Sequence, residues 1–107
     1  MRMSKMKEQI LVHRIRKKKD SKAFDEVYGM YAKGVHRHIV LRIPSKEEAE
    51  DLKQEVFLKL WDYLISKPRA VENLKALIYK IAQNLIAAYY VNQNLAKTYK
   101  DKDKIEL

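Results

Sequence analysis

The residues best suited to chemistry lie between positions 75 and 84, where cations, an aromatic ring and two amides are mixed. Their spacings of one, three, four and five residues place them on adjoining faces of one predicted helix. Cations contact phosphate, rings stack on unpaired bases and amides read base edges, so the mixture is typical of a surface for single-stranded nucleic acid. The set comprises Lys75, Tyr79, Lys80, Gln83 and Asn84. In the alternative interpretation, the tyrosines at 79, 89 and 90 are ordinary core or boundary residues.

A second cluster that could do chemistry consists of Glu47, Glu48, Glu50, Asp51 and Glu55. A carboxylate metal site of the di-iron type needs a Glu-x-x-His spacing, which this sequence lacks. A solvated acidic helix face explains the cluster better. We therefore expect no metal site.

Catalysis by other groups is not expected either. His36 and His38 are two residues apart, so on a helix they point to different sides and form a poor metal clamp. The sequence contains no glycine-rich phosphate loop, no HExxH motif and no nucleophile elbow. It also contains no cysteine, which excludes disulfides and thiolate sites and favours a reducing compartment. We expect a protein that is not an enzyme and uses no cofactor.

The overall charge points to a polyanionic partner. The 107 residues allow one domain, and 23 Lys and Arg against 14 Asp and Glu give a net charge of +9. The longest uninterrupted apolar stretch, residues 85–91, is far shorter than the ~20 residues that span a bilayer. No signal peptide is recognisable. We expect a cytoplasmic protein that binds nucleic acid rather than a membrane.

The charge is divided along the chain. Residues 1–22 carry nine Lys and Arg and two acids, residues 45–62 carry three Lys and six acids, and residues 63–100 carry six Lys and Arg and one acid. The local net charges are therefore +7, −3 and +5. Because a polyanion is repelled by the acidic middle, the pattern predicts two faces with different partners. The alternative is a solvated acidic face without a partner.

Helical periodicity predicts the elements that position these residues. One helix is expected over about 7–17, and a second from a cap at Ser21 to the break at Pro44. A third begins at the capping box of Ser45 and Glu48, and a fourth begins after a cap at Asn73. The apolar stripe of the fourth helix comprises Leu74, Leu77, Ile78, Ile81, Leu85 and Tyr89.

These elements predict an all-α fold, a compact bundle of three to four helices over residues 10–95. Only two Gly and two Pro are present, which argues against a hairpin-rich β fold. A basic lead of residues 1–9 is expected before the bundle, and a polar, flexible tail of residues 96–107 after it.

Two stretches carry a family resemblance: AEDLKQEVFLKLW at 49–61 and LKALIYKIAQNL at 74–85. Together they resemble region 2 of bacterial sigma factors, in particular those of the extracytoplasmic function (ECF) group of the sigma-70 family. Upstream, LVHRI at 11–15 and KAFDEVY at 22–28 resemble the opening helices of the same domain. The resemblance covers about residues 10–90 and implies a helical bundle of the sigma region 2 type, a transcription initiation module.

The resemblance assigns the acidic third helix to region 2.2, which in the family docks on the coiled-coil clamp helices of the largest subunit of core RNA polymerase. It implies polar contacts from Asp51, Gln54 and Glu55. Apolar contacts are implied for Phe57, Leu58 or Trp61. An anti-sigma factor is a further candidate partner.

The fourth helix resembles regions 2.3 and 2.4, which in the family open the promoter and hold the non-template strand of the −10 element. Asn84 falls on the asparagine of the family's Ile-Ala-x-Asn motif, which contacts a flipped base. Tyr79 and Lys80 fall on its Tyr-Arg pair, for stacking and phosphate contact. The resemblance thus implies promoter DNA as the second partner of this helix.

The chain departs from the family at three positions of that helix. Leu77 stands where many members have Trp, Gln83 replaces a frequent Arg, and Ala88 replaces a frequent Asp. Fewer phosphate cations lower DNA affinity and its salt dependence. No region 4 domain is expected after Tyr99. Two other interpretations stay open: a sigma-like module that binds polymerase or an anti-sigma factor without opening promoters, and a nonspecific basic helical nucleic-acid binder.

Overall fold

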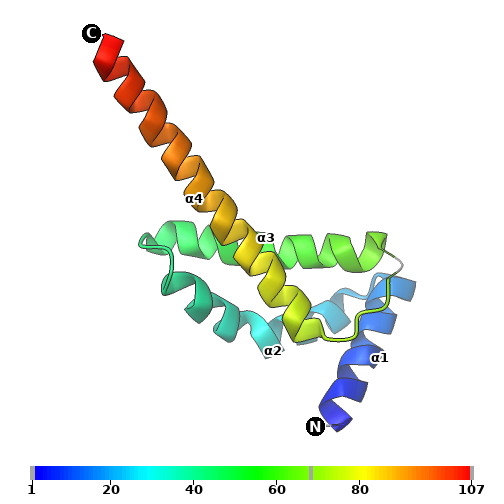
Figure 1. The fold of residues 1–107 in the computed structure, drawn as a ribbon. Coiled ribbons are helices and arrows are strands. Elements are labelled where there is room, and N and C mark those ends of the chain that lie inside the picture. Colours follow the sequence, from blue (N-terminus) through cyan, green and yellow to red (C-terminus); the bar gives the residue numbers. More distant parts are fainter. Residues whose placement is uncertain (1, 68, 107) are drawn as a thin grey trace.

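The computed structural model describes the backbone of residues 2–67 and 69–106, and the side chains of 5–67 and 69–97. It contains four helices: α1 (Arg2–Lys18), α2 (Ser21–Val40), α3 (Lys46–Ser66) and α4 (Leu74–Glu106). Figure 1 shows α4 crossing the other helices, with its second half extending away from them. The prediction of an all-α bundle is confirmed.

The start of α2 differs from the prediction by one residue. Asp20, not Ser21, is the N-cap, and its carboxylate accepts hydrogen bonds from the backbone N–H groups of Lys22 at 3.0 Å and Ala23 at 3.2 Å. A carboxylate is favoured at this position because its charge complements the positive end of the helix dipole. Lys19, at a φ of 50°, turns the chain between α1 and α2.

The caps predicted for α3 and α4 are confirmed. The hydroxyl of Ser45 accepts from the backbone N–H of Glu48 at 3.3 Å, and the amide oxygen of Asn73 accepts from that of Ala76 at 3.0 Å. The Glu48 carboxylate accepts a hydrogen bond from the hydroxyl of Tyr89 on α4. Glu48, the second residue of the predicted capping box, therefore ties α3 to α4.

Two helix boundaries differ from the prediction. α1 begins at Arg2 rather than near Lys7, and α2 ends at Val40, ahead of Pro44. The chain leaves α2 earlier because the backbone N–H groups of Arg42 and Ile43 both bond to the carbonyl of Ile39, which closes a turn. The Ile43 side chain is buried and anchors this turn in the core.

The core lies between all four helices, and α4 faces it with a stripe rotated from the predicted one. Leu74 and Ile78 are buried as expected, but Ala82 and Ile86 complete the stripe. The other predicted members, Leu77, Ile81, Leu85 and Tyr89, are partly buried at its edge. Ala82, fully buried, has a side chain short enough for α4 to lie close to its neighbours.

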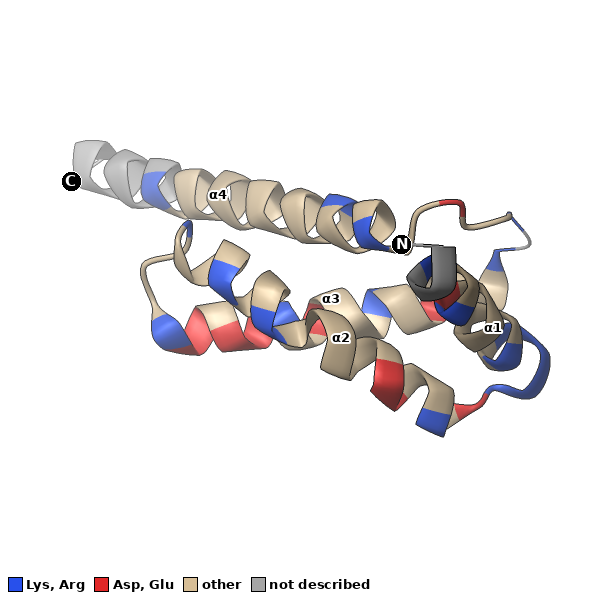
Figure 2. Cartoon of the chain, turned by 90° about the horizontal axis from the view of Figure 1, so that it is seen from below, with Lys and Arg blue, Asp and Glu red and all other residues tan. Residues whose placement is uncertain are grey.

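The charges separate in space as they do along the chain. In Figure 2, Lys and Arg residues gather on α1 and on the turn that follows it, whereas acidic residues gather along the first half of α3. The side chains of residues 91–97 on the projecting part of α4 are all exposed. The predicted flexibility of 96–107 stays a prediction, because the side chains of 98–107 lie outside the described residues.

Candidate functional site: an apolar groove and a polar helix face

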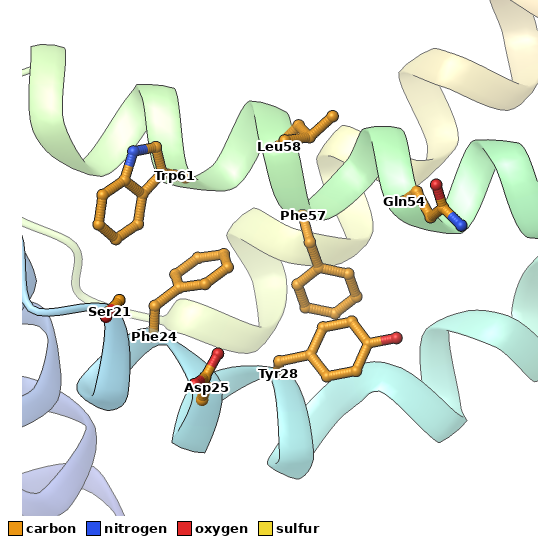
Figure 3. Close-up of a pocket in the computed structure, with 8 residues that line it drawn as sticks. All are labelled: Ser21, Phe24, Asp25, Tyr28, Gln54, Phe57, Leu58 and Trp61. Carbon is orange, nitrogen blue, oxygen red and sulfur yellow. The ribbon is translucent and has the colours of Figure 1, made fainter.

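A groove of about 510 Å³ lies between α2 and α3 (Figure 3). Its α3 wall contains Gln54, Phe57, Leu58 and Trp61, four of the six residues predicted to contact polymerase. Its α2 wall consists of Ser21, Phe24, Asp25 and Tyr28. The structure therefore brings most of the predicted docking residues together around one hollow.

Aromatic rings give the groove its shape. The ring of Phe24 meets the ring of Trp61 edge to face, with centroids 5.2 Å apart, and Tyr28 meets Phe57 with centroids 4.7 Å apart. Phe24 and Phe57 make a longer edge contact at 6.4 Å. Because such contacts favour one relative orientation of the rings, the walls are held in place without a partner.

The apolar residues of α3 divide into floor and rim. Phe57 is only 4% exposed and forms part of the core beneath the groove. Leu58 is 66% exposed, so its side chain stands on the rim where another molecule can cover it. Trp61 is partly buried and packs against the core. Leu58 and Trp61 are therefore the residues that an occupant would bury further.

The two predicted acidic contacts lie beside the groove rather than in it. Asp51 and Glu55 are exposed on α3 and do not line the hollow. At spacings of three, four and seven residues, they share one helix face with Gln54 and Leu58. The arrangement is an apolar hollow with a polar, acidic rim on the α3 side.

Sequence reasoning missed the α2 wall of this site. Phe24 and Tyr28 fall in the stretch that resembles the opening helices of the family domain, and neither is among the predicted contact residues. Phe24 packs against the core, whereas Tyr28 is 38% exposed. The signal was present in the sequence, since two aromatic residues four apart are followed on the next helix by Phe57 and Trp61, also four apart.

An ion pair between Lys53 and Glu50 lies on α3, closer to the start of that helix than the groove residues. The ammonium of Lys53 lies 2.8 Å from one oxygen of Glu50, and Nδ1 of His36 lies 3.6 Å from the other. The hydrogen bond from Lys53 lowers the pKa of Glu50, and the same bond raises the pKa of Lys53. Both groups therefore keep their charges and neutralise one another.

Four of the five predicted DNA-contacting residues are exposed on α4. Lys75, Lys80, Gln83 and Asn84 are exposed, and the Lys75 ammonium lies 6.0 Å from the centroid of the Tyr79 ring. Together these four residues offer two cations and two amides to the solvent. The geometry suits phosphate contacts and contacts to base edges.

Tyr79 is held against α2 instead of standing free. Its ring meets the ring of His38 edge to face at 5.3 Å, and its hydroxyl occupies the space above Gly34. Burial lowers the pKa of His38, the nearby Arg42 charge lowers it further, and the side chain of Gln83 acts in the opposite direction. Tyr79 is thus a partly buried boundary residue, as in the alternative interpretation.

The fold is a small all-α helical bundle that carries an apolar groove between α2 and α3 and a polar face on α4. A comparison with curated proteins finds similarity to the ECF RNA polymerase sigma factor BldN of Streptomyces coelicolor, which is 31% identical over 71 residues. The match covers 66% of this chain, which spans only 27% of the length of that protein. The similarity supports a relationship to the sigma-70 family and suggests a sigma-like role in transcription.

No family model matches the chain, and no solved structure matches it. Within the described residues, none of the helices has an apolar stretch long enough to cross a membrane.

Proposed function

We propose that this chain is a sigma-like domain of region 2 type that docks on core RNA polymerase through the α2–α3 groove. The observation that carries the proposal is the convergence of Gln54, Phe57, Leu58 and Trp61 on one preformed hollow. The similarity to an ECF sigma factor supplies the partner class. The domain would act in the cytoplasm, with no catalytic residue and no cofactor of its own.

The shape of the groove suits a helical partner. It is lined mainly by apolar side chains and runs between two helices, which is the geometry into which an amphipathic helix inserts. The clamp helices of the largest polymerase subunit would bury Leu58 and the open face of Trp61. Asp51 and Glu55 would then lie at the rim, where charges set orientation and association rate more than affinity.

The docking proposal is tested with Leu58→Asp and Asp51→Lys, measured by titration against the isolated clamp coiled coil. Both positions are exposed, so neither change should unfold the domain. We expect binding to fall at least about tenfold with Leu58→Asp, because a charge would be buried in an apolar contact. The matched control is Leu41→Asp, since Leu41 is 72% exposed and does not line the groove. Equal binding by all four proteins would contradict docking at this groove.

We also propose that the outward side of α4 contacts the non-template strand of the promoter −10 element. Lys75 and Lys80 would contact phosphate, while Gln83 and Asn84 would contact base edges. The test is binding of a single-stranded −10 oligonucleotide compared with a scrambled one. Asn84→Ala should remove the difference between the two sequences, whereas Lys80→Ala should weaken both equally and reduce the salt dependence.

One observation favours a second candidate, a sigma-like module that binds polymerase or an anti-sigma factor but does not open promoters. Tyr79 has the ring that the family resemblance implies for base stacking, but its ring and hydroxyl are packed against α2. Equal, weak binding to both oligonucleotides, together with intact polymerase binding, would favour this module. Equal oligonucleotide binding without polymerase binding would favour a nonspecific nucleic-acid binder.

A further inference from the structure

The α2–α3 groove continues well beyond the predicted docking residues. A second hollow of about 520 Å³ shares Tyr28 with the first, and a third of about 610 Å³ shares His36 and Val40 with the second. Together they follow α2 from Ser21 to Pro44. The 20 residues of α2 correspond to about 30 Å of groove, enough for five turns of a second helix.

The α2 wall is built from two parallel rows of residues spaced four apart. The inner row comprises Phe24, Tyr28, Ala32, His36 and Val40. The outer row comprises Ser21, Asp25, Gly29, Lys33 and Arg37. Rows of this spacing are the ridges between which a neighbouring helix packs.

Neither backbone conformation nor packing requires a glycine at Gly29, in the middle of the outer row. Its φ is not positive, and a β-carbon added to it would meet no atom within 4 Å. At Gly34, by contrast, the added carbon would lie 2.6 Å from the Tyr79 hydroxyl. Glycine weakens a helix interior, and its use there commonly marks a place where another backbone approaches closely. Gly29 lowers the wall at the point where the first two hollows meet.

The groove changes in charge beyond Gly29. Lys33 and Arg37 are exposed on the outer row, and no ion pair involves either of them among the described residues. The Glu50 and Lys53 side chains on the opposite wall neutralise one another. Two cations are therefore available on one edge of the groove, which complements carboxylates on a partner.

We infer that the helix docked in the aromatic part of the groove crosses α2 directly over Gly29 and presents acidic side chains to Lys33 and Arg37. The inference rests on the proposed polymerase docking, and it specifies the chemistry and path of the partner. The partner helix carries apolar side chains where it meets Phe24 and Trp61 and small side chains where it crosses Gly29. Beyond Gly29 its side chains are acidic.

The test compares Gly29→Gln and the double variant Lys33→Glu/Arg37→Glu with the unaltered chain, in binding to the clamp coiled coil. Gly29→Gln should raise the melting temperature by about 2–5 °C, because glycine is replaced in an open helix position. It should also weaken binding at least about tenfold, because its side chain obstructs the crossing. The double variant should bind more weakly by a similar factor, and its binding should depend less on salt concentration. Lys17→Glu/Lys18→Glu, on α1, is the control with the same change in charge.

Three other results would each contradict the inference. If Leu58→Asp loses binding while Gly29→Gln and the double variant bind normally, the partner occupies only the aromatic part, and this inference fails while the docking proposal stands. If Gly29→Gln is less stable than the unaltered chain, the fold itself needs the glycine, and the inference also fails. If the folded, unaltered chain does not bind the coiled coil, docking and the inference fail together.

Discussion

The hydroxyl of Tyr79 lies over Gly34, 2.6 Å from the position that a β-carbon at residue 34 would take. Helix α4 therefore contacts α2 through a side chain that fits only because residue 34 has none. This contact lies beside the polar face of α4 that carries Lys80 and Gln83. It also explains one of the two glycines within α2.

The contact predicts a non-additive pair of substitutions. Gly34→Ala should lower the free energy of unfolding by about 1 kcal/mol, because the clash with Tyr79 exceeds the helix gain of alanine. In a Tyr79→Phe background the hydroxyl is gone, so the same substitution should be neutral or stabilising. Urea unfolding of the four proteins gives the coupling energy. Stabilisation by Gly34→Ala in both backgrounds would contradict the contact.

The division of α3 into floor and rim predicts unequal losses of stability at two adjacent residues. Phe57→Ala should cost about 3 kcal/mol of unfolding free energy, because it opens a cavity beneath the groove. Leu58→Ala should change stability by less than about 0.5 kcal/mol, because its side chain is largely exposed. Thermal or urea unfolding followed by circular dichroism measures both. Similar losses at the two positions would show that the rim residue belongs to the core.

A hydrogen bond between Tyr31 and Glu8 attaches α1 to α2, so removal of the tyrosine hydroxyl should lower the free energy of unfolding. Tyr31 on α2 donates a hydrogen bond to the Glu8 carboxylate on α1, and burial together with this bond raises the pKa of Tyr31. Tyr31→Phe should lower stability by about 1–2 kcal/mol, because Glu8 loses its partner in a half-buried site. Tyr63→Phe is the control, since no hydrogen bond of its hydroxyl is found among the described residues. Equal effects of the two substitutions in urea unfolding would count against this attachment.

His38 predicts a loss of stability in mild acid. Burial lowers its pKa in the folded protein, so below its ordinary value of about 6.5 the unfolded chain binds more protons than the folded one. Stability due to this group is therefore complete above that value and is lost as the pH falls through the lowered pKa. Melting temperatures between pH 7.5 and 5 should fall less steeply for His38→Asn than for the unaltered chain. Equal slopes for the two proteins would contradict the lowered pKa of His38.

Local signals in the sequence predicted the helices and two of their caps. Ser45 and Asn73 cap α3 and α4 because a short polar side chain satisfies N–H groups within the next three residues, and no distant contact is required. Asp20 and Ser21 are both suitable caps, and only the turn through Lys19 selects the first. The rotation of the α4 stripe depends on how closely Ala82 approaches other helices, which periodicity does not contain.

The candidate site was predicted on one wall only. The resemblance to sigma region 2 implied Asp51, Gln54, Leu58 and Trp61, which all lie on α3. The opposite wall depends on the pairing of α2 with α3, which places Phe24 beside Trp61 although they are 37 positions apart. The packing of Tyr79 on Gly34 joins residues even farther apart. Such contacts follow from tertiary packing and not from residue spacing.

The projecting half of α4 would amplify any tilt of that helix relative to the bundle. Ile86 is the last buried residue of that helix among the side chains that the structure describes, and the helix continues to Glu106. The 20 residues between them correspond to about 30 Å, so a tilt of about 10° at the bundle displaces the far end by about 5 Å. The binding proposed for the polar face between Lys75 and Asn84 would act at the near end of this helix, beside the bundle. A small tilt there would become a displacement several times larger at the far end.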